Sequence, residues 1–328
     1  MAAPIKGTNP TGTSKGEKLQ GKDGDDIITG FGGNDDIDGG RGFDIAVYTG
    51  NYSEYTVESL GTGNNKVTVA DSVVGRDGTD SLKQVEALQF DDRLVVFGAG
   101  GPVSYFVNAE IDESAQKPAT ETMIAGNGIP ATGFGIARAE EAGLELGLQV
   151  IYRNGPTVLS SDDYSDGVLE YTVNDGPQST LNGSTSNAAN RAAWNYEWSI
   201  AGGLNGETTD LTDFTIKLLI DGDPSAAIDY TELLLVHNPA IATGSSEFFW
   251  DAGLPVPFIS DDAGIDPTVT QNSQNYAFGA HQALLPPGST YTQAGGFAGP
   301  AQFDIALQAF DSANTLIAEN HIQVNVVV

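Results

Sequence analysis

The sequence contains no cysteine. A disulfide scaffold, a thiolate zinc site and a cysteine nucleophile are therefore excluded. Cations are scarce as well, because 14 Lys and Arg stand against 44 Asp and Glu and give a formal net charge of -30. Such a charge repels phosphate backbones and anionic lipid surfaces, so we expect no nucleic-acid partner.

Long apolar runs are also missing. The first residues, MAAPIKGTNPTGTSKG, lack the hydrophobic stretch of a secretory signal. No run approaches the roughly 18 apolar residues that span a membrane, so we expect neither Sec export nor a membrane span. Because 40% of the 328 residues are hydrophobic, the chain can still bury a core of ordinary size, and we expect a globular protein of two or three domains.

The sequence offers no convincing catalytic motif. The histidines are isolated, without the HExxH spacing of a zinc protease: His237, His281 and His321. The letters GxSxG of a serine-hydrolase elbow occur as GTSKG at 12–16, but inside a glycine-rich stretch without a recognisable base partner, so we expect no serine hydrolase. Three acids on or near expected strands leave glycoside cleavage open, because a sequence does not give the separation of two carboxyl groups: Glu170, Glu197 and Glu247. We expect no enzyme.

Four nine-residue units follow one another without a gap. They read GTSKGEKLQ, GKDGDDIIT, GFGGNDDID and GGRGFDIAV, and each begins with glycine: Gly12, Gly21, Gly30 and Gly39. Position six is always acidic: Glu17, Asp26, Asp35 and Asp44. Position eight is always apolar: Leu19, Ile28, Ile37 and Ala46. Gly/Asp-rich composition alone is also typical of a flexible linker, but four units in one register favour a folded repeat.

This pattern has the features that a parallel β-roll needs. Glycines allow left-handed backbone, so tight turns can point carbonyl oxygens at a cation. The acids add charged oxygens, and calcium prefers six to eight oxygen ligands. The aliphatic side chains of position eight would stack as a thin core.

The units closely resemble the RTX, or hemolysin-type, repeats of proteins exported by type I secretion, whose pattern is GGxGxDxUx with U a large aliphatic residue. The resemblance implies that each ion lies between one turn and the turn two further on. Asp26 would then pair with Asp44, and Glu17 with Asp35, for two or three calcium ions in total. The first unit departs from the pattern, with Lys15 where the family has glycine and glutamate where it has aspartate.

The stretch after the repeats, from Tyr48 to Leu94, resembles the module that usually follows such rolls. Its signature is DGTDSLKQVEALQF, in which three apolar residues are expected to pack on the end of the roll: Val85, Leu88 and Phe90. Asp77 and Asp80 either hold a further ion or cap a turn. The full set of candidate calcium ligands is Glu17, Gly21, Asp23, Asp26, Gly30, Gly32, Asp35, Gly39, Arg41, Asp44, Asp77 and Asp80.

The rest of the chain is predicted to form an antiparallel β-sandwich of jelly-roll type, so the fold class is all-β. Apolar residues alternate with period two in 144–152 and 322–328, and shorter strands are expected at 168–173, 196–201, 214–220, 231–236 and 303–310. One short helix is expected at 137–142. The predicted domains are an N-terminal arm (1–11), the roll with its flanking module (12–97), a hinge (98–103) and the acidic sandwich (104–328).

Two further features of the predicted sandwich lead to hypotheses about calcium and sugar binding. Three acidic clusters each either bind calcium or serve as ordinary turns: Asp162, Asp163 and Asp166; Asp221, Asp223 and Asp229; Asp261, Asp262 and Asp266. Alternation places Trp198 on the core face, while Trp194 and Trp250 are candidate platforms for sugar rings.

These features lead to one expected function and one alternative. We expect a calcium-stabilised, non-enzymatic extracellular or cell-surface protein, such as a subunit of a surface layer, filament or biofilm matrix, or an adhesin. It would leave the cell through a type I secretion apparatus and then self-associate or bind extracellular polysaccharide. The alternative is a polysaccharide-binding lectin or carbohydrate-active enzyme that uses the roll for export and stability.

Overall fold

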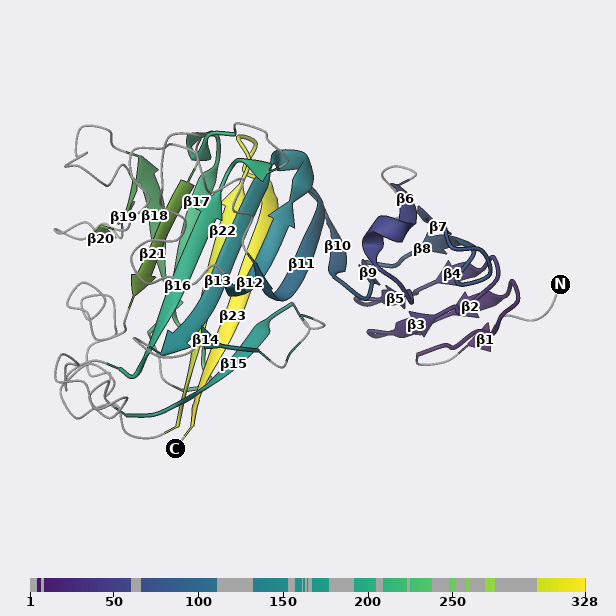
Figure 1. Ribbon diagram of the computed structural model, residues 1–328, viewed down its shortest axis with the longest axis horizontal. Helices are drawn as coiled ribbons and strands as arrows, with labels where there is room; N and C mark the ends of the chain where they lie inside the picture. The colour runs from purple at the N-terminus through teal and green to yellow at the C-terminus, as the bar shows by residue number, and fades with distance from the viewer. Residues whose placement is uncertain are drawn as a thin grey trace. The chain divides into compact units, whose positions relative to one another are not determined.

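The computed structural model describes residues 5–6, 9–59, 66–110, 132–152, 157–160, 162, 164, 167–176, 192–204, 209–222, 225–237, 248–251, 258–259, 269–274 and 300–327. The chain divides into two compact units. Unit 1 comprises residues 1–98 and 102–105, and unit 2 comprises residues 99–101 and 106–328. Both are built from strands, so the fold is all-β (Figure 1). Within the described residues, no helix is long and apolar enough to cross a membrane.

The repeats form a parallel β-roll in unit 1. Each contributes one three-residue strand: β2 (Lys18–Gln20), β3 (Ile27–Thr29), β4 (Asp36–Asp38) and β5 (Ile45–Val47). Strand β2 pairs in parallel with β4, and β3 with β5, so partners lie two repeats apart. Successive repeats therefore contribute to two sheets in alternation, and β1 (Ile5–Lys6) pairs with β2 at one end (Figure 1).

The segment after the repeats continues both sheets of the roll. Strand β8 (Thr79–Lys83) pairs in parallel with β4, and β9 (Ala87–Gln89) pairs in parallel with β5. Beyond β8 in the same sheet, β7 (Val67–Asp71) pairs antiparallel with β8, and β6 (Tyr55–Ser59) pairs antiparallel with β7. In the other sheet of the roll, β10 (Leu94–Gly98) pairs antiparallel with β9. A short 3-10 turn, η1 (Tyr52–Glu54), precedes β6. The roll therefore has two more turns than the sequence repeat has units.

The core of unit 1 is the stack of position-eight side chains. Buried aliphatics from the four repeats lie in one cluster with residues of the downstream segment: Leu19, Ile28, Ile37, Ala46, Leu82, Val85 and Leu88. Tyr48 stacks on Phe90 with ring centroids 5.4 Å apart and closes the cluster. The expected packing of Val85, Leu88 and Phe90 on the end of the roll is confirmed.

The described residues of unit 2 contribute to two sheets, the first of which also includes residues 102–105 of unit 1 in β11. In the first, β11 (Gly101–Glu110), β12 (Thr132–Ala139), β13 (Leu144–Tyr152), β16 (Trp194–Ala201) and β21 (Val269–Gln274) are neighbours, and β14 (Thr157–Val158) pairs with β13. The second has the order β15 (Leu169–Asn174), β23 (Leu316–Val327), β22 (Ala301–Phe310), β17 (Thr215–Asp221), β18 (Tyr230–His237), β19 (Phe248–Asp251) and β20 (Phe258–Ile259). The strands expected from alternation are all present.

Side chains from the two sheets of unit 2 meet in a common core. Trp194 of β16 contacts Phe303 of β22, with ring centroids 5.9 Å apart. The buried amide of Asn320, on β23, donates to the carbonyl oxygens of Gly135 on β12 (2.7 Å) and Leu146 on β13 (2.8 Å). These contacts place the two sheets face to face, as in a sandwich.

Two details of unit 2 differ from the sequence prediction. Strand β15 runs parallel to β23, so the second sheet is mixed. The short helix expected at 137–142 is wrong: residues 137–139 belong to β12, which pairs with β13, and only Glu140–Ala142 form a 3-10 turn, η2. Alanine favours a helix in isolation, but the pairing of β12 with the strongly apolar β13 outweighs that preference here.

Candidate calcium site

The acids of the roll form two columns. In the first acid column, which comprises Glu17, Asp35 and Asp80, each backbone N–H donates to the carboxylate of the next member. The Glu17 amide lies 2.8 Å from Asp35 Oδ1, and the Asp35 amide lies 2.8 Å from Asp80 Oδ1. The pairing of Glu17 with Asp35 that the repeat spacing predicts is therefore present in the structure.

The second acid column comprises Asp26, Asp44 and Glu86. The Asp26 amide donates to Asp44 Oδ1 at 2.8 Å, and the Asp44 amide donates to Glu86 Oε2 at 2.9 Å. Asn9 extends this column at its outer end, where its amide lies 3.0 Å from Asp26 Oδ1. The structure thus also brings together the expected pair of Asp26 and Asp44.

The second carboxylate oxygen of each repeat acid is placed differently in the first two repeats, here called the outer repeats, and in the last two, called the inner repeats. In the first two repeats it accepts the N–H of position two: Thr13 donates to Glu17 Oε2 at 2.8 Å, and Lys22 donates to Asp26 Oδ2 at 2.7 Å. In the last two repeats, Asp35 Oδ2 and Asp44 Oδ2 are buried and have no hydrogen-bond partner. A buried carboxylate oxygen without a partner is costly, so these two positions are suited to a cation.

Position-one glycines leave room beside these oxygens. A side chain at Gly30 would collide with Asp35 Oδ2, and one at Gly39 would collide with Asp44 Oδ2 and the carbonyl oxygen of Gln84. The absence of a Cβ therefore leaves a space where carboxylate and carbonyl oxygens face the same backbone. Hard oxygen donors of this kind fit calcium.

Burial also determines the charge state of these acids. It raises the pKa of Asp35 to about 6 and that of Asp44 to about 6, although in each case a backbone hydrogen bond from the neighbouring acid lowers the pKa. Burial raises the pKa of Asp80 to about 7. The ionised forms are thus destabilised in the protein alone, and a divalent cation would restore them.

The carboxylates are distributed along the roll and do not converge at one point. In the described part of the chain, no group of three or more His, Cys, Asp or Glu side chains could hold a metal ion. Each turn supplies one acid, so an ion in the roll would take several of its ligands from backbone carbonyls. Calcium accepts such ligands readily.

The candidate ligands at position three lie at the edge of the roll. The side chains of Asp23 and Arg41 are more than four-fifths exposed and form an ion pair at 4.0 Å, so they point away from the acid columns. The Arg41 carbonyl already accepts a hydrogen bond from the Gly24 amide at 2.6 Å. The third member, Gly32, lies close to the carbonyl oxygen of Arg76.

Asp77 lies outside both acid columns, and its two oxygens already accept hydrogen bonds. Thr49 Oγ1 donates to Oδ1 at 3.0 Å, while the Thr49 amide and the Tyr55 hydroxyl donate to Oδ2 at 2.9 and 2.5 Å. Arg76 neutralises the acids beside it, with ion pairs to Asp71 at 2.6 Å and Glu54 at 2.7 Å. This arrangement matches the turn-capping alternative for Asp77, whereas Asp80 belongs to the first acid column.

Sequence reasoning missed Glu86, although a signal for it exists. In all six turns of the roll an acid is followed two residues later by a buried apolar residue, as in Asp80 with Leu82 and Glu86 with Leu88. The spacing between these last two acids is six residues instead of nine, so a search for a strict nonapeptide period does not detect them.

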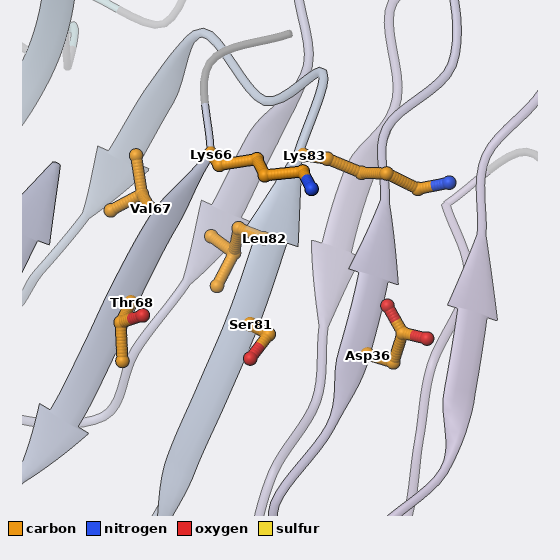
Figure 2. Close-up of a pocket in the computed structure, with 7 residues that line it drawn as sticks. All are labelled: Asp36, Lys66, Val67, Thr68, Ser81, Leu82 and Lys83. Carbon is orange, nitrogen blue, oxygen red and sulfur yellow. The ribbon is translucent and has the colours of Figure 1, made fainter. Parts of the chain in front are cut away.

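The outer face of the roll carries an open pocket of about 310 Å³, lined by residues of β4, β7 and β8 (Figure 2). Asp36, Ser81 and Lys83 lie on this face, on the opposite side of their strands from the buried Ile37 and Leu82. Asp36 forms an exposed ion pair with Lys18 at 2.8 Å. The Asp36 carboxylate is therefore solvated, in contrast to the acids of the two columns.

The acidic clusters of unit 2 are described only in part, whereas its three tryptophans are all described. Of the clusters, residues 163, 166, 223, 261, 262 and 266 lie outside the described residues. Asp162 accepts the amide of Glu170 at 3.2 Å, and Asp221 accepts that of Asp229 at 3.0 Å, as turn residues do. Trp198 is buried as expected, but the hypothesis of sugar platforms is wrong, because Trp194 and Trp250 are also 0% exposed within the packed sheets.

Of the three candidate catalytic acids, the structure describes Glu170 and Glu197. Glu197 is fully buried and accepts a hydrogen bond from the Gln149 amide at 2.7 Å, and burial raises its pKa to about 8. Glu170 is exposed, and residue 247 lies outside the described residues. His321 contacts Asp304 at 2.9 Å, and His237 packs against Phe248, while residue 281 is likewise outside them.

The parallel roll, its glycine turns and its two acid columns define a calcium-binding β-roll. Residues 11–46 match four copies of the RTX calcium-binding nonapeptide repeat, so this part of the chain is a segment of RTX type. A search of curated protein sequences finds no match to the chain.

Proposed function

We propose that this chain is a secreted extracellular protein that completes its folding on binding calcium outside the cell and then serves a structural or adhesive role. The observation that carries the calcium step is the pair of buried oxygens, Asp35 Oδ2 and Asp44 Oδ2, which have no partner in the protein alone. Calcium binding at these oxygens contributes folding free energy, because the unfolded chain offers no preformed site.

The export step of this proposal rests on the RTX repeats, which are typical of proteins that leave the cell by type I secretion. The low calcium concentration inside cells keeps the acids of the roll uncompensated, so the chain passes through the apparatus unfolded. Calcium outside then acts as the signal of location. The absence of cysteine suits this route, since no disulfide has to form after export.

The structural or adhesive role rests on the acidic, strand-rich unit 2 and on the lack of a catalytic motif. The partner is a second copy of the chain, as in a surface layer, filament or matrix, or an extracellular polysaccharide. Calcium would link neighbouring acidic surfaces that otherwise repel one another at a net charge of -30.

The test is to purify the chain without calcium and to add calcium while following far-UV circular dichroism and particle size together. We expect a rise in β structure, followed by assemblies visible by electron microscopy, and reversal of both by EGTA. Magnesium at the same concentration is the control. Folding without assembly or binding to polysaccharide would contradict the structural role, and an unchanged spectrum would contradict the calcium step.

A further inference from the structure

The two acids outside the four repeats occupy the same structural position as the repeat acids. Asp80 accepts the amide of Asp35, as Asp35 accepts that of Glu17. Glu86 accepts the amide of Asp44, as Asp44 accepts that of Asp26. Residues 79–89, here called the closing segment, therefore supply the last member of both acid columns.

Apolar side chains of the closing segment continue the core in the same register. Leu82 is the pairing partner of Ile37, and Leu88 is the partner of Ala46. Leu82 and Leu88 are 3% and 0% exposed. Docking of the closing segment thus aligns its acids with the repeats through the same aliphatic stack that aligns the repeats with one another.

The backbone of the closing segment places a carbonyl oxygen where a repeat turn does, but with a different conformation. Gln84 has a φ of 50°, a left-handed conformation that glycine adopts more easily, whereas Gly39 has no positive φ. Its amide side chain donates to the Gly40 carbonyl at 2.7 Å, and its own carbonyl oxygen lies over Gly39, as the carbonyl of Gly39 lies over Gly21. A non-glycine residue is held here in a strained conformation that directs a carbonyl oxygen toward the second acid column.

The oxygens without a partner lie in the two repeats next to the closing segment. Asp35 Oδ2 faces Gly30, with Asp80 Oδ2 on the same side, and Asp44 Oδ2 faces Gly39 below the Gln84 carbonyl. In the outer repeats the corresponding oxygens are already used by backbone amides. The most suitable cation positions are therefore those that the repeats share with the closing segment.

We propose that Asp80 and Glu86 are calcium ligands that complete the two innermost sites of the roll, so that residues 11–46 alone cannot form the full set of sites. This inference rests on the calcium step of the proposed function. Residues 35 and 80 are 45 positions apart in the chain, and residues 44 and 86 are 42 apart. Calcium binding at these sites therefore requires β8 and β9 to pair with the repeats, and it couples the repeats to the module that follows them.

The test uses the full chain with Asp80→Asn and Glu86→Gln, each compared with Asp36→Asn. The first two changes remove a charge but keep an oxygen that can accept the amide of Asp35 or Asp44. The control removes a charge from the exposed outer face of β4. We expect each test variant to bind one calcium ion fewer by equilibrium dialysis, or to need about tenfold more calcium for folding, and the control to match the wild type.

The ion count at saturating calcium separates loss of a ligand from loss of a structural contact. We expect the variants to fold at high calcium but to hold one ion fewer than the wild type. A roll that is less stable at saturating calcium yet binds the full number of ions would overturn the inference. If the wild type binds calcium and the variants bind equally well, the closing segment supplies no ligand and the proposed function is unaffected. If the wild type binds none, the calcium step itself is wrong.

Discussion

Both units of the chain bury carboxylates, but they stabilise them in different ways. In unit 2, Glu197 lies within a strand, receives a hydrogen bond from a side-chain amide and has a pKa raised by burial to about 8, which favours its neutral form. In unit 1, Asp35 and Asp44 also keep one buried oxygen without a hydrogen-bond partner, as Glu197 Oε1 does. They differ from Glu197 in accepting a backbone amide from a neighbouring acid, in lying beside glycines, and in pKa values raised only to about 6. The comparison favours a proton as the partner of Glu197 and a cation as the proposed partner of Asp35 and Asp44.

The largest expected effect is the response of the two units to chelation. EGTA should abolish amide protection in residues 12–97, because calcium supplies much of the folding free energy of the roll. Unit 2 should be unaffected. All three tryptophans lie in unit 2, so their fluorescence reports on it alone. Hydrogen exchange by mass spectrometry, together with tryptophan fluorescence, measures both responses. Equal loss of protection in both units would contradict the expectation that only the roll depends on calcium.

The core of the roll should respond to a substitution in the usual way. Ile28 is 0% exposed and Ile27 beside it is 47% exposed, so the two residues form a matched pair. In saturating calcium, Ile28→Ala should lower the free energy of unfolding of unit 1 by about 2 to 4 kcal/mol, because it leaves a cavity in the aliphatic stack.

The control substitution, Ile27→Ala, should change the same free energy by less than about 0.5 kcal/mol. Denaturation followed by far-UV circular dichroism measures both variants. Similar effects for the two isoleucines would mean that the alternation of buried and exposed residues in β3 is not as described.

We expect pH to have a smaller effect, which is on the free energy of unfolding of unit 2. Burial raises the pKa of Glu197 from its ordinary value of 4.5 to about 8, so the folded state holds the proton more tightly than the unfolded state does. The stabilisation is complete below about pH 4.5 and is lost as pH rises through about 8. Because water penetration reduces the effect of burial, we expect a loss of about 2 kcal/mol.

Tryptophan-monitored unfolding at about pH 4.5 and about pH 9 measures this loss. Glu197→Gln should remove most of the difference between the two pH values, since glutamine has no proton to lose. The variant Glu232→Gln, at an exposed ion pair with Lys217, is the control and should retain it. A pH dependence that persists in Glu197→Gln would assign the effect to another group.

The sequence predicts the roll well because its information is local. A glycine at position one, an acid at position six and an aliphatic residue at position eight specify turn, charge and core within nine residues. Glu86 escapes this reasoning, because its turn has a different length and reaches its partner Asp44 only through tertiary contacts.

In unit 2 the alternation of apolar residues predicts the strands but not their partners. Alternation indicates which face of a strand is buried, but the choice of neighbour depends on contacts across the whole sheet. The parallel pair of β15 and β23 is one example. Burial of Trp194 and Trp250 is another, because an aromatic residue near a strand end has the same sequence pattern whether it packs inside or stands exposed.

The most direct test of the central claim is a count of bound calcium in the wild type and in the double variant Asp35→Asn/Asp44→Asn by equilibrium dialysis. Our account predicts roughly two or three ions for the wild type, because calcium takes six to eight oxygens and each site draws on adjacent turns. The double variant should lose at least the two innermost ions and leave residues 12–97 unprotected against hydrogen exchange in calcium. An unchanged ion count, with the same protection, would contradict the account.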